Sequence, residues 1–423
     1  MTETVDRGTG SPDQKARSGF FRSLFSHWGR RSILAVCSFW VVVALWQAPI
    51  VPVTKTSEIR GVWMTNRSAS LMHYTTRLDE TMANLARHRL NTLYPCVWNR
   101  GQTLHPSGVF QRASRTGRSL LAQLPGYDVL SGLVQQGHRQ HLRVIPWFEY
   151  GLMIPIRSPI AQRHPDWLTT TQSGAITLDS DGQPKKLPKP IADLKETFFG
   201  IDQGWLNPVH PQVQQFLTDL IVDVVKRYSV DGIQLDDHFA LPIEFGYDRY
   251  TIERYQADHR GNLPSTNPSD PEWMAWRAKQ LTQLMGKISK AVRAAKPNML
   301  ISLSPNTPDY AYRKSLQDWR RWVKLGLVDE VVVQIYRSDV GDFKAGLETG
   351  GFADLKGQVP IAVGLYAGRF LSAKPIRQLQ QEVEAVRSSD YAGVSFFCWE
   401  TTLWLFKRSS ESQVQQAFAR FFQ

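Results

Sequence analysis

The sequence predicts an α/β domain of the (β/α)8 type, a TIM barrel, preceded by an apolar segment long enough to cross a membrane. From residue 58 onward, short runs of apolar and β-branched residues alternate with amphipathic stretches of helical periodicity. This alternation indicates a parallel sheet covered by helices. Eight strand and helix pairs are counted over about 365 residues, which suits a barrel with insertions. The glycine-rich phosphate loops typical of open, doubly wound sheets are absent from the sequence.

The first 53 residues consist of a polar tail and an apolar run. Residues 1–31 contain six basic and three acidic side chains and end in Arg30 and Arg31. Residues 32–53 carry no charge and number about 20, which matches the hydrocarbon core of a bilayer. Because basic flanks stay on the cytoplasmic side, we expect a single-pass inner-membrane protein with a cytoplasmic tail. The domain 58–423 is then periplasmic or otherwise extracytoplasmic.

A cleaved signal peptide is the competing interpretation of the apolar run. Residues 46–49 make a poor cleavage site because Pro49 is unfavourable just after a cut, so an uncleaved anchor is favoured. Cys37 is preceded by Val36, which disfavours a lipoprotein signal. Under either interpretation the domain is exported.

Composition and charge exclude several classes of protein. The formal net charge is +12, but no compact Lys/Arg run with interleaved aromatic residues is present, so no nucleic-acid partner is predicted. A dispersed, solvated charge explains the balance most simply, and acidic glycans or anionic lipids are the next candidates. The three cysteines form no zinc-binding spacing, and we predict no metal and no cofactor. The 14 tryptophans fit either a rich core or a sugar-binding cleft. The oligomeric state is left open.

The predicted strands and helices follow one another regularly along the chain. The strands are expected at residues 60–66, 91–98, 143–149, 231–237, 300–304, 330–336, 360–366 and 393–399. Helices are expected at residues 78–88, 129–141, 212–228, 273–295, 316–325, 376–387 and 413–422. The insertion 150–204 after the third strand is too long for a simple connector, so we expect it to form a lid or a wall of a substrate cleft. A second insertion, 238–271, follows the fourth strand.

Catalytic groups in this fold stand at the C-terminal ends of the strands. Polar or aromatic side chains occupy nearly every predicted strand end, which suits a carbohydrate cleft. The predicted substrate-binding residues are Asn66, Trp98, Trp147, His238, Asn306, Gln334, Tyr336, Tyr366 and Trp399. We expect the aromatic members of this set to line one concave face.

The fourth strand is the most informative. Side chains alternate between the two faces of a strand, so Ile233 and Leu235 should face the helices while Gln234 and Asp236 face the barrel axis. Asp236 is therefore the carboxylate expected to point at a substrate above the barrel. For Asp237, a catalytic role and a structural role as a cap or loop hydrogen-bonding residue are both open.

Glycosidic cleavage needs a second carboxyl group beside Asp236. Glu149 shares a face with Trp147 on the third strand. Glu400 follows the eighth strand, where strict alternation turns it away from the axis unless the strand end bulges. Glu244, in the loop after strand four, is a further option, and a structural salt bridge is the alternative for each glutamate.

His238 is in phase with Asp236. It could act as a metal ligand beside the two aspartates, but no HxH or HExxH motif accompanies it. A hydrogen bond to the substrate or to Asp236 is therefore the favoured interpretation.

Several motifs together resemble the bacterial glycosyl-hydrolase-like family 10. The opening strand reads EIRGVWMTN at 58–66, and the fourth strand reads YSVDGIQLDD at 228–237. Between them lie HPDW at 164–167, WLNP at 205–208 and HP at 210–211, in the order that the family shows. The resemblance covers residue 58 to the C-terminus. The motifs are specific in combination, although each alone is weak.

The resemblance implies a (β/α)8 glycosidase and makes bacterial wall glycan a candidate substrate, because the family includes a division-associated enzyme that cuts peptidoglycan strands stripped of peptides. It carries a catalytic role over to Asp236. The Trp-Phe-Glu-Tyr form of residues 147–150 departs from an Asn-containing form in other members, which puts the role of Glu149 in doubt. The predicted anchor also departs from the family pattern if its relatives are lipoproteins.

Two other classes of protein compete with the glycosidase. A non-catalytic glycan-binding barrel, serving envelope assembly, would keep the aromatic strand ends without needing paired carboxylates. A metal-dependent polysaccharide deacetylase would need an Asp/His/His set, which the fourth strand supplies only in part. The carboxylates at strands three, four and eight favour the glycosidase over both.

Overall fold

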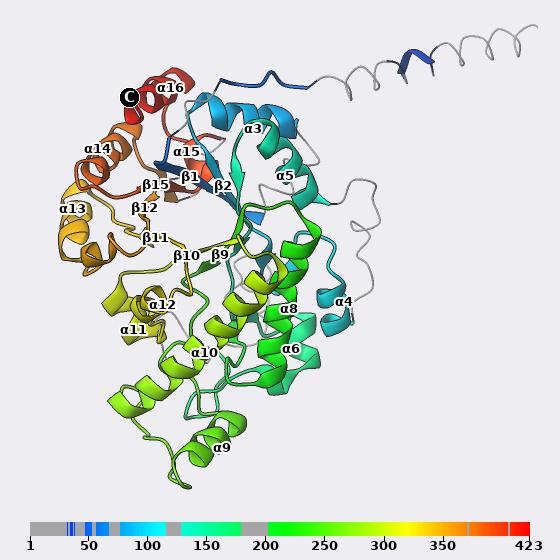
Figure 1. Ribbon diagram of the computed structural model, residues 1–423, viewed down its shortest axis with the longest axis vertical. Helices are drawn as coiled ribbons and strands as arrows, with labels where there is room; N and C mark the ends of the chain where they lie inside the picture. Colours follow the sequence, from blue (N-terminus) through cyan, green and yellow to red (C-terminus); the bar gives the residue numbers. More distant parts are fainter. Residues whose placement is uncertain are drawn as a thin grey trace, which may run out of the picture. The chain divides into compact units, whose positions relative to one another are not determined.

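A computed structural model describes the chain in two compact units, Met1–Pro49 and Ile50–Gln423 (Figure 1). The residues described are 32, 34–36, 38, 47–52, 56–66, 77–115, 128–178, 202–369, 372–404 and 407–423. The predicted tail 1–31 and half of the predicted anchor 32–53 lie outside these residues. Among the residues described, no helix is both long enough and apolar enough to span a bilayer.

The second unit is built on one parallel sheet of nine strands. Their order across the sheet is β5 (Arg143–Val144), β2 (Thr92–Pro95), β1 (Ile59–Met64), β15 (Gly393–Phe397), β12 (Ile361–Tyr366), β11 (Glu330–Gln334), β10 (Leu300–Ser304), β9 (Gly232–Asp236) and β6 (Trp147–Phe148). Each of the eight predicted strands lies in this sheet, with ends displaced by at most three residues. The predicted parallel α/β organisation is therefore confirmed.

The sheet curls until its two ends meet in one segment of chain. β5 pairs with β2, β6 pairs with β9, and only Ile145 and Pro146 separate β5 from β6. Proline has no N–H to donate to a neighbouring strand, so the predicted third strand is divided into two pieces. A parallel bridge between Cys96 and Trp147 ties the end of the second strand to β6.

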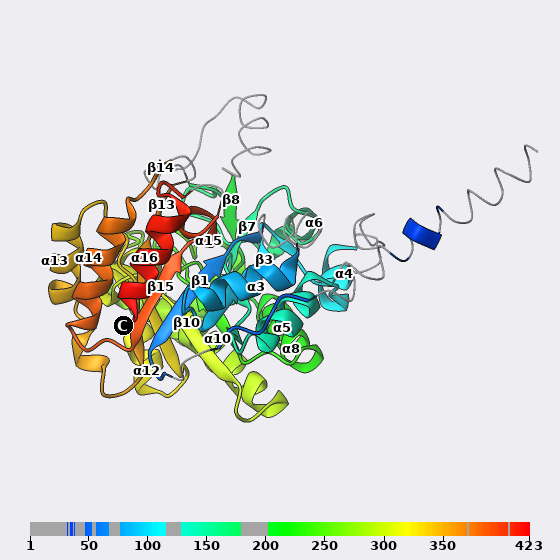
Figure 2. The same cartoon turned by 90° about the horizontal axis from the view of Figure 1, so that it is seen from above.

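Helices lie around the outside of the curled sheet (Figures 1 and 2). Following the eight predicted strands in turn, they are α3 (Leu78–Arg87), α5 (Val129–Arg139), α8 (Pro211–Arg227), α10 (Pro271–Ala295), α12 (Trp319–Lys324), α13 (Val340–Thr349), α14 (Ile376–Arg387) and α16 (Glu411–Phe421). The helix predicted at 316–325 begins only at Trp319, because Leu316 adopts a left-handed conformation that ends α11 (Pro308–Ser315).

Local sequence signals explain where several of these helices begin. The carboxylate of Asp270 accepts a hydrogen bond from the Trp273 amide at 3.0 Å, and Pro271 occupies the first turn of α10. An acceptor side chain before the helix and a proline at its start both favour initiation at that point. Asp128 caps α5 and Ser410 caps α16 in the same way.

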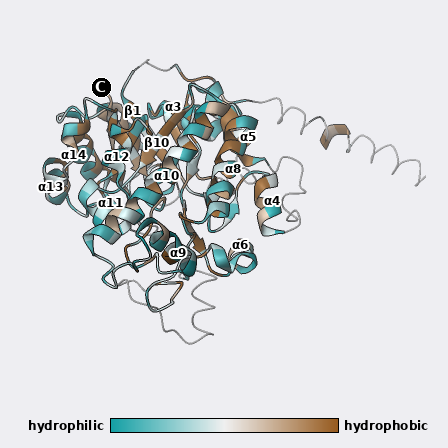
Figure 3. Cartoon of the chain, turned by 60° about the horizontal axis from the view of Figure 1, so that its bottom comes forward, coloured by the Kyte–Doolittle hydropathy of each residue, from teal (hydrophilic) through white to brown (hydrophobic). Residues whose placement is uncertain are grey.

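The curled sheet separates two apolar regions. Ile233 and Leu235 of β9 belong to the larger core between the sheet and the helices. Trp63, Tyr94 and Trp147 belong to a smaller core on the inner face. Figure 3 shows the apolar residues gathered in the strands and on the helix faces turned toward them. The inner face is therefore filled with side chains, and in this fold the chemistry is carried by residues at the C-terminal ends of the strands.

Both insertions lie at the C-terminal ends of the strands. The first contains α6 (Pro159–Arg163), the 3-10 helix η2 (Pro165–Trp167) and an antiparallel ribbon of β7 (Met153–Pro155) and β8 (Gln203–Trp205), while residues 179–201 are outside those described. The second contains α9 (Arg249–Asp258). The Leu152 amide donates to the His238 carbonyl at 3.0 Å, which joins the two insertions beside the end of β9. The lid or cleft-wall role stays a prediction.

Candidate active site

The end of β9 carries the candidate catalytic carboxylate. Gln234 accepts a hydrogen bond from the Trp63 indole on the inner face of the curled sheet at 2.7 Å, whereas Ile233 and Leu235 pack against the helices. Asp236 follows Gln234 on the inner face, and only 3% of its side chain is exposed. The orientation predicted from strand alternation is therefore confirmed.

Both carboxylate oxygens of Asp236 have hydrogen-bond partners. The amide of Gln334, at the end of β11, donates to Oδ1 at 2.9 Å, and it also contacts Ser304 Oγ at 3.1 Å. The Nδ1 atom of His238 lies 3.3 Å from Oδ2. Asp236 is therefore held rigidly at the C-terminal end of the lumen, in contact with strands β10 and β11.

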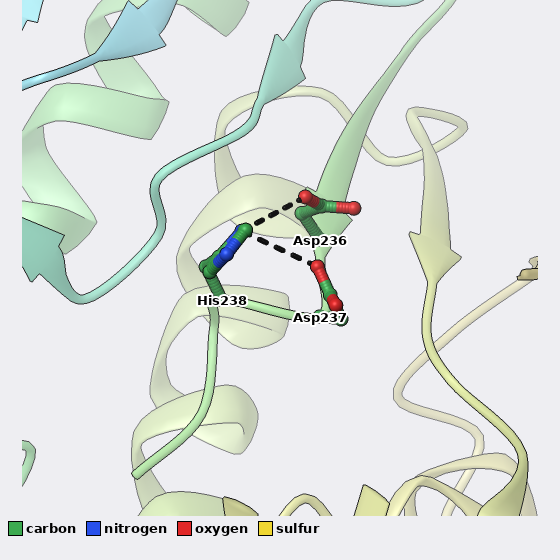
Figure 4. Close-up of side chains that lie close together, drawn as sticks. All are labelled: Asp236, Asp237 and His238. Carbon is green, nitrogen blue, oxygen red and sulfur yellow. Dashed lines mark hydrogen bonds and ion pairs between the residues drawn. The ribbon is translucent and has the colours of Figure 1, made fainter. Parts of the chain in front are cut away.

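Asp237 lies beside Asp236 (Figure 4), and its side chain is the more exposed of the two. Its Oδ1 is 3.3 Å from the same Nδ1 of His238, and its Oδ2 accepts a hydrogen bond from Asn306 at 2.8 Å. Its side chain is 24% exposed. Facing oxygen and nitrogen atoms of Asp236, Asp237 and His238 all lie within 4.8 Å of one another. The structure thus assembles a compact cluster from three consecutive residues.

The charges of this cluster are strongly coupled. Burial and the neighbouring charge of Asp237 raise the pKa of Asp236 well above its usual range. Desolvation lowers the pKa of His238, but the charges of Asp237 and Asp236 outweigh it and raise that pKa to about 10. At neutral pH the imidazole is therefore a cation between two carboxyl groups, of which Asp236 tends to retain a proton.

The same three side chains are the group among the described residues that could hold a metal ion. A metal would require a neutral imidazole with a free ring nitrogen. Here Nδ1 already faces two carboxylate oxygens and the Glu149 carbonyl oxygen at 3.2 Å. The arrangement suits a hydrogen-bonded imidazolium better than a metal ligand.

Phe148 of β6 pairs with Leu235 of β9, so the residues that follow them, Glu149 and Asp236, lie opposite each other. Neighbouring strands lie about 5 Å apart, so the two acidic residues are adjacent at the strand ends. The Oε2 atom of Glu149 accepts hydrogen bonds from the Asn99 amide and from the Cys96 thiol, the latter at 3.2 Å. Burial raises the pKa of Glu149, although these two donors oppose the shift.

Glu400 also faces the strand ends. β15 stops at Phe397 and the short helix α15 (Trp399–Thr402) follows, so strand alternation no longer applies at residue 400. Glu400 Oε1 accepts hydrogen bonds from the Thr65 amide at 3.1 Å and from its hydroxyl at 2.5 Å. The charge of Glu400 also acts on Glu149. Glu244, in contrast, interacts with the buried Arg277 of α10.

Three of the predicted aromatic residues meet at the end of the lumen. The Tyr336 ring lies between Phe397, at 5.5 Å, and Tyr366, at 5.6 Å. The centroid of the Trp147 ring lies 6.1 Å from that of Phe397, so Trp147 extends the same group of rings. Burial and the nearby charges of Asp236 and Asp237 raise the pKa of Tyr336 well above its usual range. An aromatic wall therefore stands beside the carboxylate cluster.

Trp98 and Trp399 lie elsewhere, so the prediction of one face shared by all five rings is wrong. Trp98 is fully buried in the outer core against Phe110 and Phe216, because the chain leaves the sheet after Cys96 and forms the hairpin β3 (Trp98–Asn99) and β4 (Gln102–Thr103). Trp399 also belongs to the outer core and stacks on Trp404 at 4.7 Å.

Asn66 and Asn306 lie near the carboxylates as expected. The Asn66 amide donates to Asn99 Oδ1 at 3.2 Å, and Asn99 in turn contacts Glu149. Asn99, Cys96 and Phe397 were not among the predicted site residues. Alternation along β15 indicates the inward direction of Phe397, but the roles of Asn99 and Cys96 depend on contacts with another strand.

Comparison with known proteins supports the same class of protein. A family model described as glycosyl hydrolase-like 10 matches residues 58–385. Glycosyl hydrolase DigH of Escherichia coli strain K12 is 26% identical over 318 residues, covering 66% of this chain and 66% of that protein. Glycosyl hydrolase YngK of Bacillus subtilis strain 168 is 25% identical over 230 residues, covering 51% of this chain and 40% of that protein.

Solved structures show the same fold at low sequence identity. The glycoside hydrolase domain of PgaB (BpsB) from Bordetella bronchiseptica has a TM-score of 0.55 and 13% identity, covering 82% of this chain and 94% of that chain. α-L-Fucosidase isoenzyme 2 from Paenibacillus thiaminolyticus has a TM-score of 0.56 and 12% identity, covering 88% of this chain and 48% of that chain. Identity this low supports the fold alone.

Proposed function

This chain belongs to the glycosyl hydrolase-like 10 family, and from that premise we propose that its (β/α)8-type domain is a glycoside hydrolase that cuts O-glycosidic bonds. One observation carries the proposal: a buried carboxyl group, Asp236, faces the inner end of the sheet among three further acidic residues and an aromatic wall. A family relationship alone gives a reaction class. The site supplies the groups that this reaction requires.

Glycosidic cleavage needs a proton for the leaving oxygen and a group that supports the positive charge developing at the sugar. Asp236 is assigned to the catalytic carboxylate set because it lies on the axis and carries a raised pKa. The second carboxyl group belongs to the set Asp237, Glu149 and Glu400. The aromatic wall at Trp147 and Tyr336 offers faces on which a sugar ring stacks.

The proposed substrate is an extracytoplasmic polysaccharide, with the glycan strands of peptidoglycan as the leading candidate. The family resemblance and the predicted export of the domain support this choice. The net charge of +12 also favours contact with an anionic wall polymer.

The test is product release from purified glycan strands, with and without attached peptides, by the wild-type protein and by Asp236→Asn. We expect soluble fragments from the wild type and a loss of several powers of ten in the variant, because Asn keeps the shape but removes the ionisable group. A wild-type protein that binds the strands without releasing fragments would instead be a glycan-binding barrel.

We also propose that the apolar run 32–53 holds the domain at the inner membrane, on its extracytoplasmic side. The charge-free run and the two arginines before it support this topology. A C-terminal reporter active only in the periplasm should be active and should fractionate with membranes. A soluble cytoplasmic product would end the proposal.

A further inference from the structure

The adjacent carboxyl groups of Asp236 and Asp237 approach a substrate from the same side. They are consecutive residues at the end of one strand, and both face Nδ1 of His238 at 3.3 Å. In the common two-carboxylate schemes, the two groups stand on opposite sides of the scissile bond. A pair from one strand end therefore does not by itself supply an acid on one face and a nucleophile on the other.

The pair is also poorly placed for direct attack on a sugar. Gln334 and His238 engage the two oxygens of Asp236, and Asn306 and His238 engage those of Asp237. A carboxylate that attacks carbon must give up the hydrogen bonds of the attacking oxygen, which is costly. A carboxylate that only accepts or donates a hydrogen bond can exchange one of its present partners for the substrate. The arrangement favours hydrogen bonding and proton transfer over formation of a covalent bond to carbon.

Tyr336 adds a hydrogen-bond donor beside the pair. Its ring is fixed between Phe397 and Tyr366, and the charges of both aspartates act on its hydroxyl. The Tyr336 side chain is half-buried. The buried indole N–H of Trp147 has no hydrogen-bond partner among the residues that the structure describes. An unpaired buried donor at a strand end is costly unless a ligand completes it.

An acceptor, a donor and an aromatic wall in one place match the three parts of an acetamido group. A carboxylate accepts its N–H, a hydroxyl donates to its carbonyl oxygen, and aromatic rings contact its methyl group. A plain hydroxyl substituent on the sugar leaves part of this set unused. The geometry therefore points to a sugar with an acetamido group next to its reacting carbon.

Building on the proposed function, whose leading substrate consists of 2-acetamido-2-deoxy sugars, we propose that the acetamido group of the substrate is itself the nucleophile. Asp236 accepts the acetamido N–H, and Tyr336 donates to the carbonyl oxygen. Asp237, with 24% of its side chain exposed against 3% for Asp236, faces the leaving group. This inference selects Asp237 as the second carboxyl group of the site.

The steps balance without any co-reactant except water. The acetamido oxygen forms a bond to C1 as the C1–O bond to the leaving sugar breaks, and the leaving oxygen takes a proton from Asp237. The cyclic oxazolinium ion that results is stabilised by Asp236. Water then attacks C1, gives its proton back to Asp237, and the acetamido group is released. Two displacements at C1 leave the sugar with retained configuration.

In the free site, burial and the charge of Asp237 raise the pKa of Asp236. Asp236 must therefore ionise when it accepts the acetamido N–H, and in the proposed reaction the proton that it gives up reaches the leaving oxygen through Asp237. His238 supplies a fixed positive charge beside both.

The first experiment compares denuded peptidoglycan strands with the same strands after chemical N-deacetylation. We expect deacetylation to lower turnover by about 100-fold or more, since the internal nucleophile is lost. Retained configuration in the products and competitive inhibition by the thiazoline of N-acetylglucosamine should accompany it. Equal turnover of both strands, or inverted products, would overturn the inference while leaving the glycosidase proposal intact. Cleavage of neither strand would refute the proposed function itself.

The second experiment uses Tyr336→Phe, with Tyr310→Phe as the matched control. Tyr310 is 55% exposed on α11 and belongs to no part of the site. Loss of the Tyr336 hydroxyl should lower kcat by about 10- to 100-fold with little change in KM, because its hydrogen bond strengthens as the carbonyl oxygen attacks. The control should behave as the wild type. An unchanged kcat in Tyr336→Phe would contradict the role given to that hydroxyl.

Discussion

Two polar clusters on the inner face of the same sheet differ in how completely their hydrogen bonds and charges are paired. The lower cluster lies at the start of β11, where the buried carboxylate of Glu330 accepts hydrogen bonds from Tyr94 at 2.9 Å, Ser302 at 3.0 Å and Arg143 at 3.0 Å. The upper cluster lies at the C-terminal end of β9. In the upper cluster, the carboxyl groups of Asp236 and Asp237 both face the imidazole of His238, and the buried indole N–H of Trp147, on the neighbouring strand β6, has no hydrogen-bond partner among the described residues.

The difference separates stability from chemistry. The lower cluster balances one negative charge with one positive charge and completes its hydrogen bonds, as a buried polar network must if it is to stabilise a fold. The upper cluster places two carboxyl groups together and leaves the buried indole N–H of Trp147 unpaired among the described residues, which costs folding free energy. Such costs are retained where a site must bind and react. The two clusters therefore predict opposite responses to the same kinds of substitution.

The largest expected effect separates activity from stability at Asp236. Asp236→Asn should lower turnover on glycan strands by about 1,000-fold or more, because a catalytic carboxyl group is lost. Its melting temperature should stay equal or rise, since the folded site disfavours the charged form of Asp236. Calorimetry and product release on the same preparation measure both. A large fall in melting temperature would place Asp236 with the structural residues.

Glu330→Gln should show the reverse. The variant removes the charge that Arg143 faces and places an amide donor opposite the guanidinium, so the free energy of unfolding should fall by about 2 kcal/mol. Turnover of the folded protein should be near that of the wild type. Glu80→Gln is the control, because its ion pair with Arg87 is solvent-exposed and should contribute under about 1 kcal/mol. Equal stability losses in both variants would contradict the comparison.

A Trp-to-Phe exchange in each cluster sharpens the comparison. Trp63→Phe breaks the 2.7 Å bond to Gln234 and should cost about 1–2 kcal/mol of unfolding free energy. Trp147→Phe breaks no indole hydrogen bond among the described residues, so its stability should change less. It should instead raise KM for glycan strands. Denaturant unfolding and kinetics distinguish the two, and a KM increase in Trp63→Phe alone would reverse the assignment.

A further expected effect is a pH dependence at His238. Its pKa is raised to about 10 in the folded protein, against an ordinary value of 6.5. The stabilising contribution of the imidazolium is therefore fully present below about pH 6.5 and is lost as pH rises through about 10. The melting-temperature difference between wild type and His238→Gln should shrink across this range. A constant difference would show that the pKa of His238 is not raised in the folded protein.

Much of this architecture could be predicted from local patterns. Alternation of apolar residues located the eight predicted strands, and the same alternation oriented Ile233, Leu235 and Asp236 correctly. It failed where the chain leaves the sheet. Trp98 belongs to a hairpin and faces the outer core, and Glu400 belongs to a helical turn, so neither follows the period of the strand before it.

The sequence by itself determined the parallel α/β organisation, the inward direction of Asp236 and the acidic set at the strand ends, because periodicity and strand order are local properties of a chain. Only the tertiary structure decided which groups act together. The proximity of Asp236 and Asp237 to one nitrogen of His238, and the hold of Asn99 and Cys96 on Glu149, depend on turn geometry and strand register. Hydrogen bonds and pKa shifts vary over a few ångströms, and contacts between strands distant in sequence set those distances.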